Sequence, residues 1–380
     1  MLRMCWQGMG RMNGRDRFIR PSSLQAISLC AGRPTLEAHV VALDGEPAPS
    51  PVANMGHDLH RRSQEAIEGW KTGEPWAESI LFACGDAESH GVDSWSIYCL
   101  RYALEAVRDL INKHSIEADN VLTEHRLDMS SLGFAQGGTA DVVLVIPGKL
   151  VVVIDFKYGH LDQGDADAHD QLQAYAAAAA ETFTASRVIV VLLQPRADKV
   201  HRISQAKFDA DTLRDNRAWT AAVIRLARGE NPQLTAGFTQ CQYCRALARC
   251  PEARRYFMDA SDALETIGKP LDADAFGELA DAAKLADRFA ETGKDLAKAE
   301  LISGRCVTGW KLGTPRAMRS IVDVSRAVLR LEAAGYAGEL GEALSMSVSK
   351  LSPPAAEVIA DQVTEKLSSP PLTQDKRKGA

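Results

Sequence analysis

The residues best suited to chemistry in this sequence are Asp141, Asp155 and Lys157, in the segment GTADVVLVIPGKLVVVIDFKYG. Successive side chains of a strand alternate between its faces, so Asp155 and Lys157 share one face. Charges that end an apolar strand are costly to bury unless they are paired or bound to a metal. Two carboxylates a few ångströms apart suit a hard divalent cation such as Mg²⁺. A neighbouring lysine can stabilise the charge that develops on a reacting phosphate.

The register of this hairpin decides whether the two acids can meet. Asp141 begins one predicted strand and Asp155 ends the next, so the chain turns between them, near Pro147. A two-residue turn would place residue 141 opposite residue 154 and leave Asp155 on the other face. A three-residue loop over 147–149, or a bulge near Asp155, places both acids on one face. We therefore predict one of these two irregularities.

A second chemical group is the run CQYCRALARC, which contains Cys241, Cys244 and Cys250 in a C-x2-C-x5-C pattern. Three cysteines within ten residues favour metal or cluster ligation over disulfides. Thiolates at this spacing can surround one soft metal centre, and such a centre needs a fourth ligand. Cys30 is the candidate for that ligand.

The period of the hydrophobic pattern indicates which elements position these residues. Helices are expected over 21–34, 54–72 with Asn54 as its cap, 75–84, 92–114, 166–182 and 206–228. Strands are expected over 120–128, 139–147, 149–157 and 187–194. The strand 149–157 is continuous and β-branched, which is typical of a central strand. The order helix, three strands, helix, strand predicts an α/β core.

The chain has 380 residues, enough for two domains or for one domain with large additions. We expect a disordered basic tail over 1–20, a core domain over 21–258 that the cysteine group closes, a helical extension over 259–350 and a flexible basic tail over 351–380. The helical pattern of 260–302 is interrupted at Gly268-Lys269-Pro270.

Composition limits the class of protein. The chain is 46% hydrophobic and 25% charged, as in ordinary soluble proteins. No apolar run reaches the ~18 residues of a membrane helix, and the N-terminus lacks the apolar core of a secretory signal. Eight cysteines without an export signal point to a reducing cytosol, so we expect a cytoplasmic protein. The net charge of −6 gives no overall electrostatic case for nucleic acid, although a local patch would suffice.

Together, these motifs resemble the PD-(D/E)XK nuclease superfamily, specifically its RecB-like branch. That branch has an acid on its second strand, acid-x-Lys on its third, Gln-x-x-x-Tyr on the following helix and Gly-x-x-x-His upstream. The last two motifs are matched here by Gln171 with Tyr175 and by Gly56 with His60. Ala140 stands where the superfamily motif has proline. The fold implied is the restriction-endonuclease-like core, αβββαβ, with a helical C-terminal extension.

The resemblance also implies roles for individual residues. His60, Asp141 and Asp155 would be ligands of Mg²⁺ or Mn²⁺, with the Phe156 carbonyl as a further ligand. Lys157 would be the catalytic lysine, and Gln171 and Tyr175 belong to the same active-site set. Glu124, on the first strand, is a weaker candidate for an outer-shell role.

RecB-like nucleases of the AddB and CRISPR-adaptation kinds hold a four-iron–four-sulfur cluster with one cysteine before the nuclease core and three after it. Cys30, Cys241, Cys244 and Cys250 match that placement and spacing, which implies a 4Fe-4S cluster joining the two ends of the domain. A four-cysteine zinc site is the main alternative, although zinc ribbons more often use two C-x-x-C knuckles. A third alternative is that no metal is bound.

Nearly the whole chain after residue 20 resembles the phage and prophage family called domain of unknown function 2800. The matching segments are PSS…CAGRP, IDFKYG, QLQAYA, CQYC, TGWKLGTPR and LSMSVSKL…LTQDKRKG. The family implies a setting in phage DNA recombination or replication, in a bacterial host cell. The expected function is a metal-dependent DNA exonuclease or end-processing nuclease. Its expected partners are DNA ends or single strands and a phage single-strand-binding or recombination protein, with no membrane. The alternative is a non-catalytic DNA-binding or assembly factor on a nuclease fold.

Overall fold

The computed structural model describes residues 13–46, 51–159, 162–196, 203–264, 273–308, 310–312 and 324–333. The chain divides into two compact units. The first comprises Met1–Gly85 and Cys99–Leu296, and the second comprises Asp86–Tyr98 and Ala297–Ala380. The central sheet and every candidate site residue belong to the first unit. Most of the predicted tail over 1–20, and all of that over 351–380, lie outside the described residues.

The centre of the first unit is a five-stranded mixed sheet with the order β1-β2-β3-β4-β5. The strands are Val121–Leu127, Gly138–Ile146, Leu150–Phe156, Arg187–Leu193 and Ile203–Phe208. Strand β3 pairs antiparallel with β2 and parallel with β4, and the outer pairs β1–β2 and β4–β5 are antiparallel. Strand β3 is therefore central, as its unbroken apolar run predicted.

The hairpin between β2 and β3 has the register that the two acids require. Ile146 pairs with Leu150, and Val142 pairs with Ile154. The connection is thus the three-residue loop 147–149, which confirms the first of the two predicted irregularities. Gly148 adopts a φ of +68° in this loop, a conformation that glycine reaches without steric cost.

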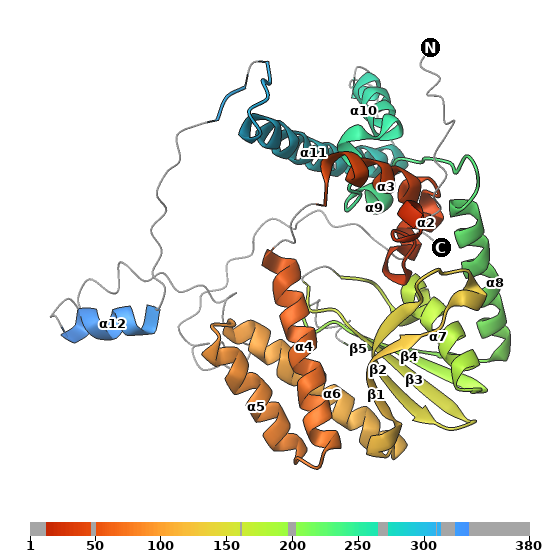
Figure 1. Cartoon of the computed structure of the whole chain (residues 1–380), viewed down its shortest axis with the longest axis vertical. Coiled ribbons are helices and arrows are strands. Elements are labelled where there is room, and N and C mark those ends of the chain that lie inside the picture. Colours follow the sequence, from red (N-terminus) through yellow and green to blue (C-terminus); the bar gives the residue numbers. More distant parts are fainter. Residues whose placement is uncertain are drawn as a thin grey trace. The chain divides into compact units, whose positions relative to one another are not determined.

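One face of the sheet forms the main hydrophobic core with α7 (Asp170–Thr182) and α8 (Ala210–Ala227). Helix α7 lies against this face, with α8 beside it (Figure 1). The β2 and β3 residues that enter this core are Ala140, Val143, Val145, Val151 and Val153, so the alternation of β2 is interrupted between Ala140 and Val143, next to Asp141. Strand side chains alternate, so Asp155 extends from the same face of β3 as Val151 and Val153.

Helix α4 (Pro51–Lys71) runs beside β1 and the end of β3. It contacts these strands through a hydrogen bond of 2.5 Å from Thr123 Oγ1 to Glu68 Oε1 and one of 2.6 Å between Ser63 Oγ and Tyr158 Oη. The helix was predicted to start at an Asn54 cap but begins three residues earlier, at a proline, which suits the first turn of a helix. Helices α5 (Trp76–Ser89) and α6 (Ser94–His114) follow it, near the predicted positions.

The predicted helix over 21–34 is wrong as one element. A short 3-10 turn and α2 (Leu24–Leu29) come first, and the chain then breaks at Cys30. Helix α3 (Arg33–Asp44) starts anew, with Pro34 in its first turn. A proline lacks the N–H that a helix interior requires, so it marks a start here and not a continuation.

The predicted helix over 206–228 is also corrected. Residues 203–208 form the edge strand β5, and α8 begins after Asp209, whose side chain accepts a hydrogen bond from Thr212 N. This N-cap satisfies a free helix donor and fixes the helix start. Strand β5 is half polar and short, which made its pattern weak.

Beyond the sheet come α9 (Phe238–Cys241), α10 (Pro251–Leu264), α11 (Ala273–Ile302) and α12 (Val324–Ala333). The predicted interruption at Gly268-Lys269-Pro270 falls between α10 and α11, outside the described residues. The boundary expected at residue 258 stays a prediction. In the parts of the chain that the structure describes, no helix combines the length and the apolar character needed to cross a membrane.

Candidate active site and cysteine cluster

Asp141, at the start of β2, joins three elements through its carboxylate. Its Oδ2 accepts a hydrogen bond of 2.6 Å from the backbone N of Phe156 on β3. Its Oδ1 lies 3.1 Å from Nδ1 of His60 on α4. This contact is made by the N–H of Phe156, and a ligand role for the Phe156 carbonyl stays a prediction.

Glu124, on β1, completes a group of three potential metal ligands with His60 and Asp141. One ligand atom of each lies within 4.8 Å of those of the other two. Glu124 has a φ of +44°, a left-handed conformation that is rare outside glycine and interrupts its pairing with β2. Such strain tends to persist where surrounding structure enforces it, and it is common at functional sites. Sequence analysis gave Glu124 a lesser role because its backbone conformation leaves no local signal.

Asp155, Lys157 and Gln171 form a closed polar triangle beside this group. Asp155 Oδ2 lies 2.6 Å from Lys157 Nζ, and Gln171 Nε2 donates to Asp155 Oδ1 at 3.0 Å. Lys157 Nζ in turn donates to Gln171 Oε1 at 3.2 Å. Asp155 is only 3% exposed and belongs to the central strand, so this is no ion pair on a surface hairpin.

Tyr175 lies one helical turn after Gln171, and its hydroxyl interacts with the side chain of that residue. Its hydroxyl donates a hydrogen bond of 2.8 Å to the backbone oxygen of Thr139, two residues before Asp141. Burial raises the pKa of this hydroxyl, with a further contribution from the charge of Asp155. The contact therefore holds α7 against the start of β2 with a neutral side chain.

The His60 ring contacts two aromatic rings, those of Phe156 at the end of β3 and of Tyr158 two residues later. Its ring meets that of Tyr158 edge to face, with centroids 5.4 Å apart, and that of Phe156 at 5.9 Å. The Tyr158 hydroxyl shares its 2.6 Å hydrogen bond with Ser63, which also donates to Leu59 O. Sequence analysis missed Tyr158 and Ser63 as supports of His60, although residues 156 and 158 share a strand face.

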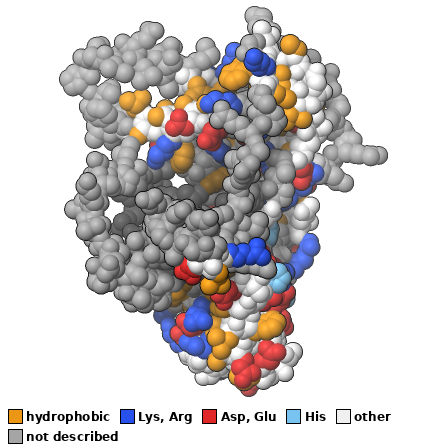
Figure 2. Space-filling model, turned by 90° about the vertical axis from the view of Figure 1, so that its left-hand side faces the viewer, with side chains coloured by type: hydrophobic (Ala, Val, Ile, Leu, Met, Phe, Trp, Pro, Cys, Tyr) orange, Lys and Arg blue, Asp and Glu red, His pale blue; other side chains and the backbone are white. Residues whose placement is uncertain are grey.

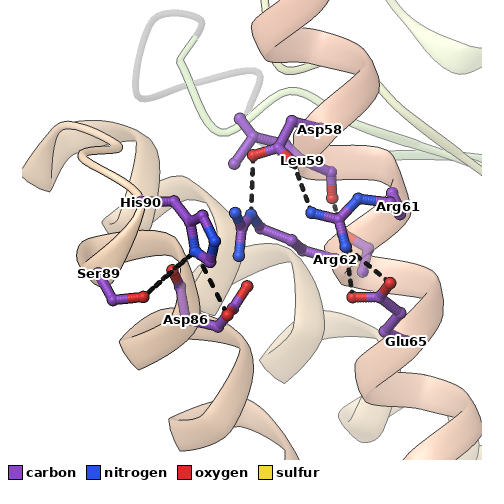
Figure 3. Close-up of polar contacts among 9 residues, drawn as sticks. Asp58, Leu59, Arg61, Arg62, Glu65, Asp86, Ser89 and His90 are labelled. Atoms are coloured by element: carbon purple, nitrogen blue, oxygen red, sulfur yellow. Dashed lines mark hydrogen bonds and ion pairs between the residues drawn. The ribbon is translucent and has the colours of Figure 1, made fainter.

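Ion pairs along α4 flank His60. Arg61 lies 2.7 Å from Asp58 and 2.7 Å from Glu65, and the buried Arg62 donates from Nε to Asp58 at 2.8 Å (Figure 3). Pairs at three- and four-residue spacing stabilise a helix. The carboxylate of Asp58 is therefore paired with Arg61 and Arg62. In the second unit, Figure 3 also shows the helix-end contacts of Ser89 and His90 with Asp86.

The charges of the site shift several of its pKa values. Burial lowers the pKa of His60, but the hydrogen bond and charge of Asp141 outweigh it, so the pKa lies above its ordinary value. Burial also lowers the pKa of Lys157, but the charges of Asp155 and Asp141 outweigh it and raise the pKa above its ordinary value. Desolvation and the charge of Asp141 raise the pKa of Glu124. Glu124 is thus held beside a carboxylate that repels its charge, a situation that a bound cation would relieve.

The donor set fits a divalent cation. Two carboxylates and one imidazole converge within a few ångströms. Asp155, also a predicted ligand, is not in this group of three, although its charge contributes to the raised pKa of His60. Carboxylate oxygens are the ligands that Mg²⁺ and Mn²⁺ prefer, and imidazole suits the softer Mn²⁺. Within this group, the backbone of Glu124 is strained, the carboxylates of Glu124 and Asp141 are close together, and Nδ1 of His60 contacts Asp141.

The segment of Cys30 contacts the chain that directly precedes the other three predicted cysteines. Cys30 ends α2, and its Sγ accepts a hydrogen bond from Thr235 N at 3.4 Å. Gly32 N donates to Gln233 O at 2.7 Å, and a Cβ on Gly32 would lie 2.8 Å from Pro232 O. The segment around Cys30 therefore packs closely against residues 232–235, which precede the other three cysteines.

The thiols of Cys30, Cys241 and Cys250 are buried, and that of Cys244 is partly buried. Burial raises the pKa of Cys30, and Cys250 adds to the effect. Burial likewise raises the pKa of Cys241, with contributions from Cys250 and Cys30, and raises that of Cys244, with one from Cys241. Side chains from α10 and α11, including Ala253, Leu285 and Phe289, pack around them. All four thiols are free, and four cysteines are the donor set of zinc and iron–sulfur centres. Among the described residues, the group of potential ligands whose atoms all lie within 4.8 Å of one another is His60, Glu124 and Asp141, so the four sulfurs are more widely spaced than that.

The described surface carries charge of both signs. On the face in Figure 2, lysine and arginine side chains stand among aspartates and glutamates. A mixed surface fits the modest net charge of the chain.

Comparisons with known proteins give a family but no activity. A family model described as "Protein of unknown function (DUF2800)" matches residues 63–366. No curated protein matches the chain. A solved structure described as the crystal structure of SSO0001 is similar over 59% of this chain and 95% of its own, with 19% sequence identity and a TM-score of 0.22. A score that low does not show a common fold.

Proposed function

This chain belongs to the DUF2800 family, and we propose that it is a metal-dependent nuclease that hydrolyses DNA phosphodiester bonds. The observation that carries the proposal is the convergence of His60, Glu124 and Asp141 beside the Asp155–Lys157 pair. Cation-binding acids next to a lysine are suited to phosphoryl chemistry, in which charge develops on the phosphate oxygens.

The proposed division of labour follows from the contacts. His60, Glu124, Asp141 and Asp155 would hold the cation, with the Phe156 carbonyl as a further ligand. A divalent cation bound there would polarise the phosphate and lower the pKa of the attacking water. Lys157, whose raised pKa keeps it protonated at neutral pH, would stabilise the developing negative charge. Gln171 would position Lys157 and Asp155, since it bonds to both.

We further propose that the α/β unit is a PD-(D/E)XK core of the RecB-like kind. The supporting features are the antiparallel β1–β3 meander, helix α7 and the parallel strand β4, which follow the expected order. The acids, lysine and glutamine occupy the positions at which that superfamily has its motifs. Strand β5 and helices α10 and α11 are additions to this core.

The setting proposed is DNA recombination or replication of a phage in the cytoplasm of its host. The substrates would be DNA ends or single strands, and a phage single-strand-binding or recombination protein would be the partner. The sequence has no phosphate-binding loop of the G-x-x-x-x-G-K-[ST] kind, so any DNA unwinding would come from a partner.

At the cysteine cluster we propose a 4Fe-4S cluster, bound by Cys30, Cys241, Cys244 and Cys250, that joins the two ends of the domain. Zinc is the alternative occupant. Protein purified without oxygen should be brown, with broad absorbance near ~400 nm and four irons per chain, as expected of thiolate-bound clusters. Cys30→Ser should lose iron, while Cys99→Ser, a buried cysteine of α6, should keep it. Colourless protein with stoichiometric zinc would favour the alternative.

A non-catalytic DNA-binding factor on the same fold is the second candidate. The observation that favours it is the engagement of both Asp155 oxygens by Lys157 and Gln171. Incubation of the full chain with end-labelled linear and circular DNA, in Mn²⁺ and in chelator, separates the two candidates. Cation-dependent products support the nuclease, and binding to DNA ends without products in Mn²⁺ supports the second candidate.

A further inference from the structure

Helix α3 begins with a buried ion pair that the proposed DNA chemistry does not use. Arg33 is 8% exposed and Glu37 is 4% exposed. They lie one turn apart, with Arg33 Nη2 at 3.2 Å from Glu37 Oε1. Burying two charges is costly, and the attraction between them often fails to recover that cost. A pair in this place therefore calls for a role beyond stability.

Arg33 and Glu37 hold the segment that contains Cys241 and Cys244. Arg33 donates from Nη1 to Gln240 O at 3.1 Å and from Nη2 to Tyr243 O at 3.0 Å. Glu37 Oε1 accepts a hydrogen bond of 2.9 Å from Arg245 N. These three contacts lie on both sides of Cys241 and Cys244. One turn of α3 thus fixes the loop without any metal.

One donor of Arg33 has no partner. Its Nε is buried and makes no hydrogen bond, although Nη1 and Nη2 each donate to a backbone oxygen. The charge of Arg33 lowers the pKa of three nearby thiols, those of Cys30, Cys241 and Cys244, against the larger effect of burial. A buried N–H near several thiols requires an acceptor, and a metal-bound thiolate is a better acceptor than a neutral thiol.

We propose that Arg33 is a positioning residue of the cysteine site that supplies the buried counter-charge and an Nε–H donor to a sulfur of the metal-bound group. The inference rests on the proposed metal at the four cysteines. Four thiolates around a core of charge +2 carry a net charge of about −2, which is costly to bury without a cation nearby. Hydrogen bonds and charges around the sulfurs tune such centres.

The direction in which Arg33→Met and Glu37→Gln change metal affinity distinguishes this role from a purely structural one. Arg33→Met and Glu37→Gln break the same ion pair, so a purely structural pair would make both weaken the site. If Arg33 acts through its charge, Arg33→Met weakens metal binding, whereas Glu37→Gln leaves binding unchanged or tightens it. Glutamine can still accept the hydrogen bond from Arg245 N.

The test is titration of the metal-free full chain with Co²⁺, read by the absorbance of thiolate-bound cobalt, with circular dichroism to confirm folding. The carboxylate site gives no such band, so the signal belongs to the cysteines. Arg33→Met should weaken binding by roughly 10- to 100-fold, as loss of an outer-sphere partner does. Arg33→Lys, which keeps the charge but has no Nε donor, should weaken it less and serves the same purpose if Arg33→Met does not fold.

Equal weakening by Arg33→Met and Glu37→Gln, or unchanged affinity in both Arg33 variants, would overturn the role of Arg33. A wild-type chain with no thiolate band, or one whose band survives Cys241→Ser, would overturn the cysteine site itself and the role of Arg33 with it. The two failures are distinguishable because the second appears in the wild type and the cysteine variant.

Discussion

Asp141 on β2 accepts a hydrogen bond of 2.6 Å from the backbone N of Phe156 on β3, across the end of the hairpin. The contact ties the first acid to the residue that directly follows the second acid, Asp155. The 147–149 loop sets a register in which Val142 pairs with Ile154, so that residues 141 and 155 directly follow the last pair of the ladder. The geometry of the site therefore depends on this loop.

Gly148→Ala tests the loop. The φ of +68° is unfavourable for alanine, so the free energy of unfolding should fall by about 1 kcal/mol. Denaturant titration measures this change. Gly159→Ala is the control, since a Cβ there meets nothing within 4 Å. Equal stability of the two variants would show that the loop does not need its glycine.

A matched pair at Glu124 tests the strained ligand. Glu124→Ala and Glu124→Gly both remove the carboxylate, so both should weaken Mn²⁺ binding to the same extent. Glycine normally destabilises a strand relative to alanine, but at a φ of +44° the order should reverse, by about 1 kcal/mol. Calorimetry and denaturant titration measure the two effects. Unchanged Mn²⁺ affinity in both variants would remove Glu124 from the ligand set.

The pH dependence of stability tests the His60–Asp141 contact. The pKa of His60 is raised in the folded protein, so its stabilisation is fully present below the unfolded pKa and is lost as pH rises through the folded value. In chelator, the unfolding free energy of the wild type should fall from about pH 6 to about pH 8 more than that of His60→Gln. Parallel pH profiles would contradict the contact.

Lys157→Met tests the pairing of the buried acid. Without its partner, Asp155 stays charged and 3% exposed, which should cost about 3–5 kcal/mol in metal-free protein. Asp155→Asn added to this variant should recover much of the loss. Mn²⁺ should raise the melting temperature of Lys157→Met more than that of the wild type, because the cation replaces the missing charge. An equal rise in both proteins would argue against a cation next to Asp155.

The hairpin and α7 could be predicted because their signals are local. The alternating acids and lysine, the β-branched run of β3 and the spacing of Gln171 and Tyr175 all lie within short segments. Strand β5 was missed because its short edge position leaves polar residues on both sides of the apolar ones. The start of α8 shows only in the Asp209 cap.

The other missed features depend on contacts between distant parts of the chain. Arg33 bonds to residues more than 200 positions later, and no local pattern announces such a contact. The left-handed backbone of Glu124 is uncommon for a glutamate, so its residue type gives no sign of it. The break between α2 and α3 is visible in Pro34, but its reason is the approach of Gly32 to the 232–235 segment.

The most direct test of the account is DNA cleavage by Asp141→Asn and Asp155→Asn. Both variants keep the shape of the side chain and lose the charge that holds the cation. With Mn²⁺ and end-labelled linear DNA, each should cleave at least about 100-fold more slowly than the wild type. Asp128→Asn, an exposed carboxylate in the turn after β1, should cleave normally. Cation-dependent cleavage at the wild-type rate by Asp141→Asn and Asp155→Asn would contradict the proposed active site.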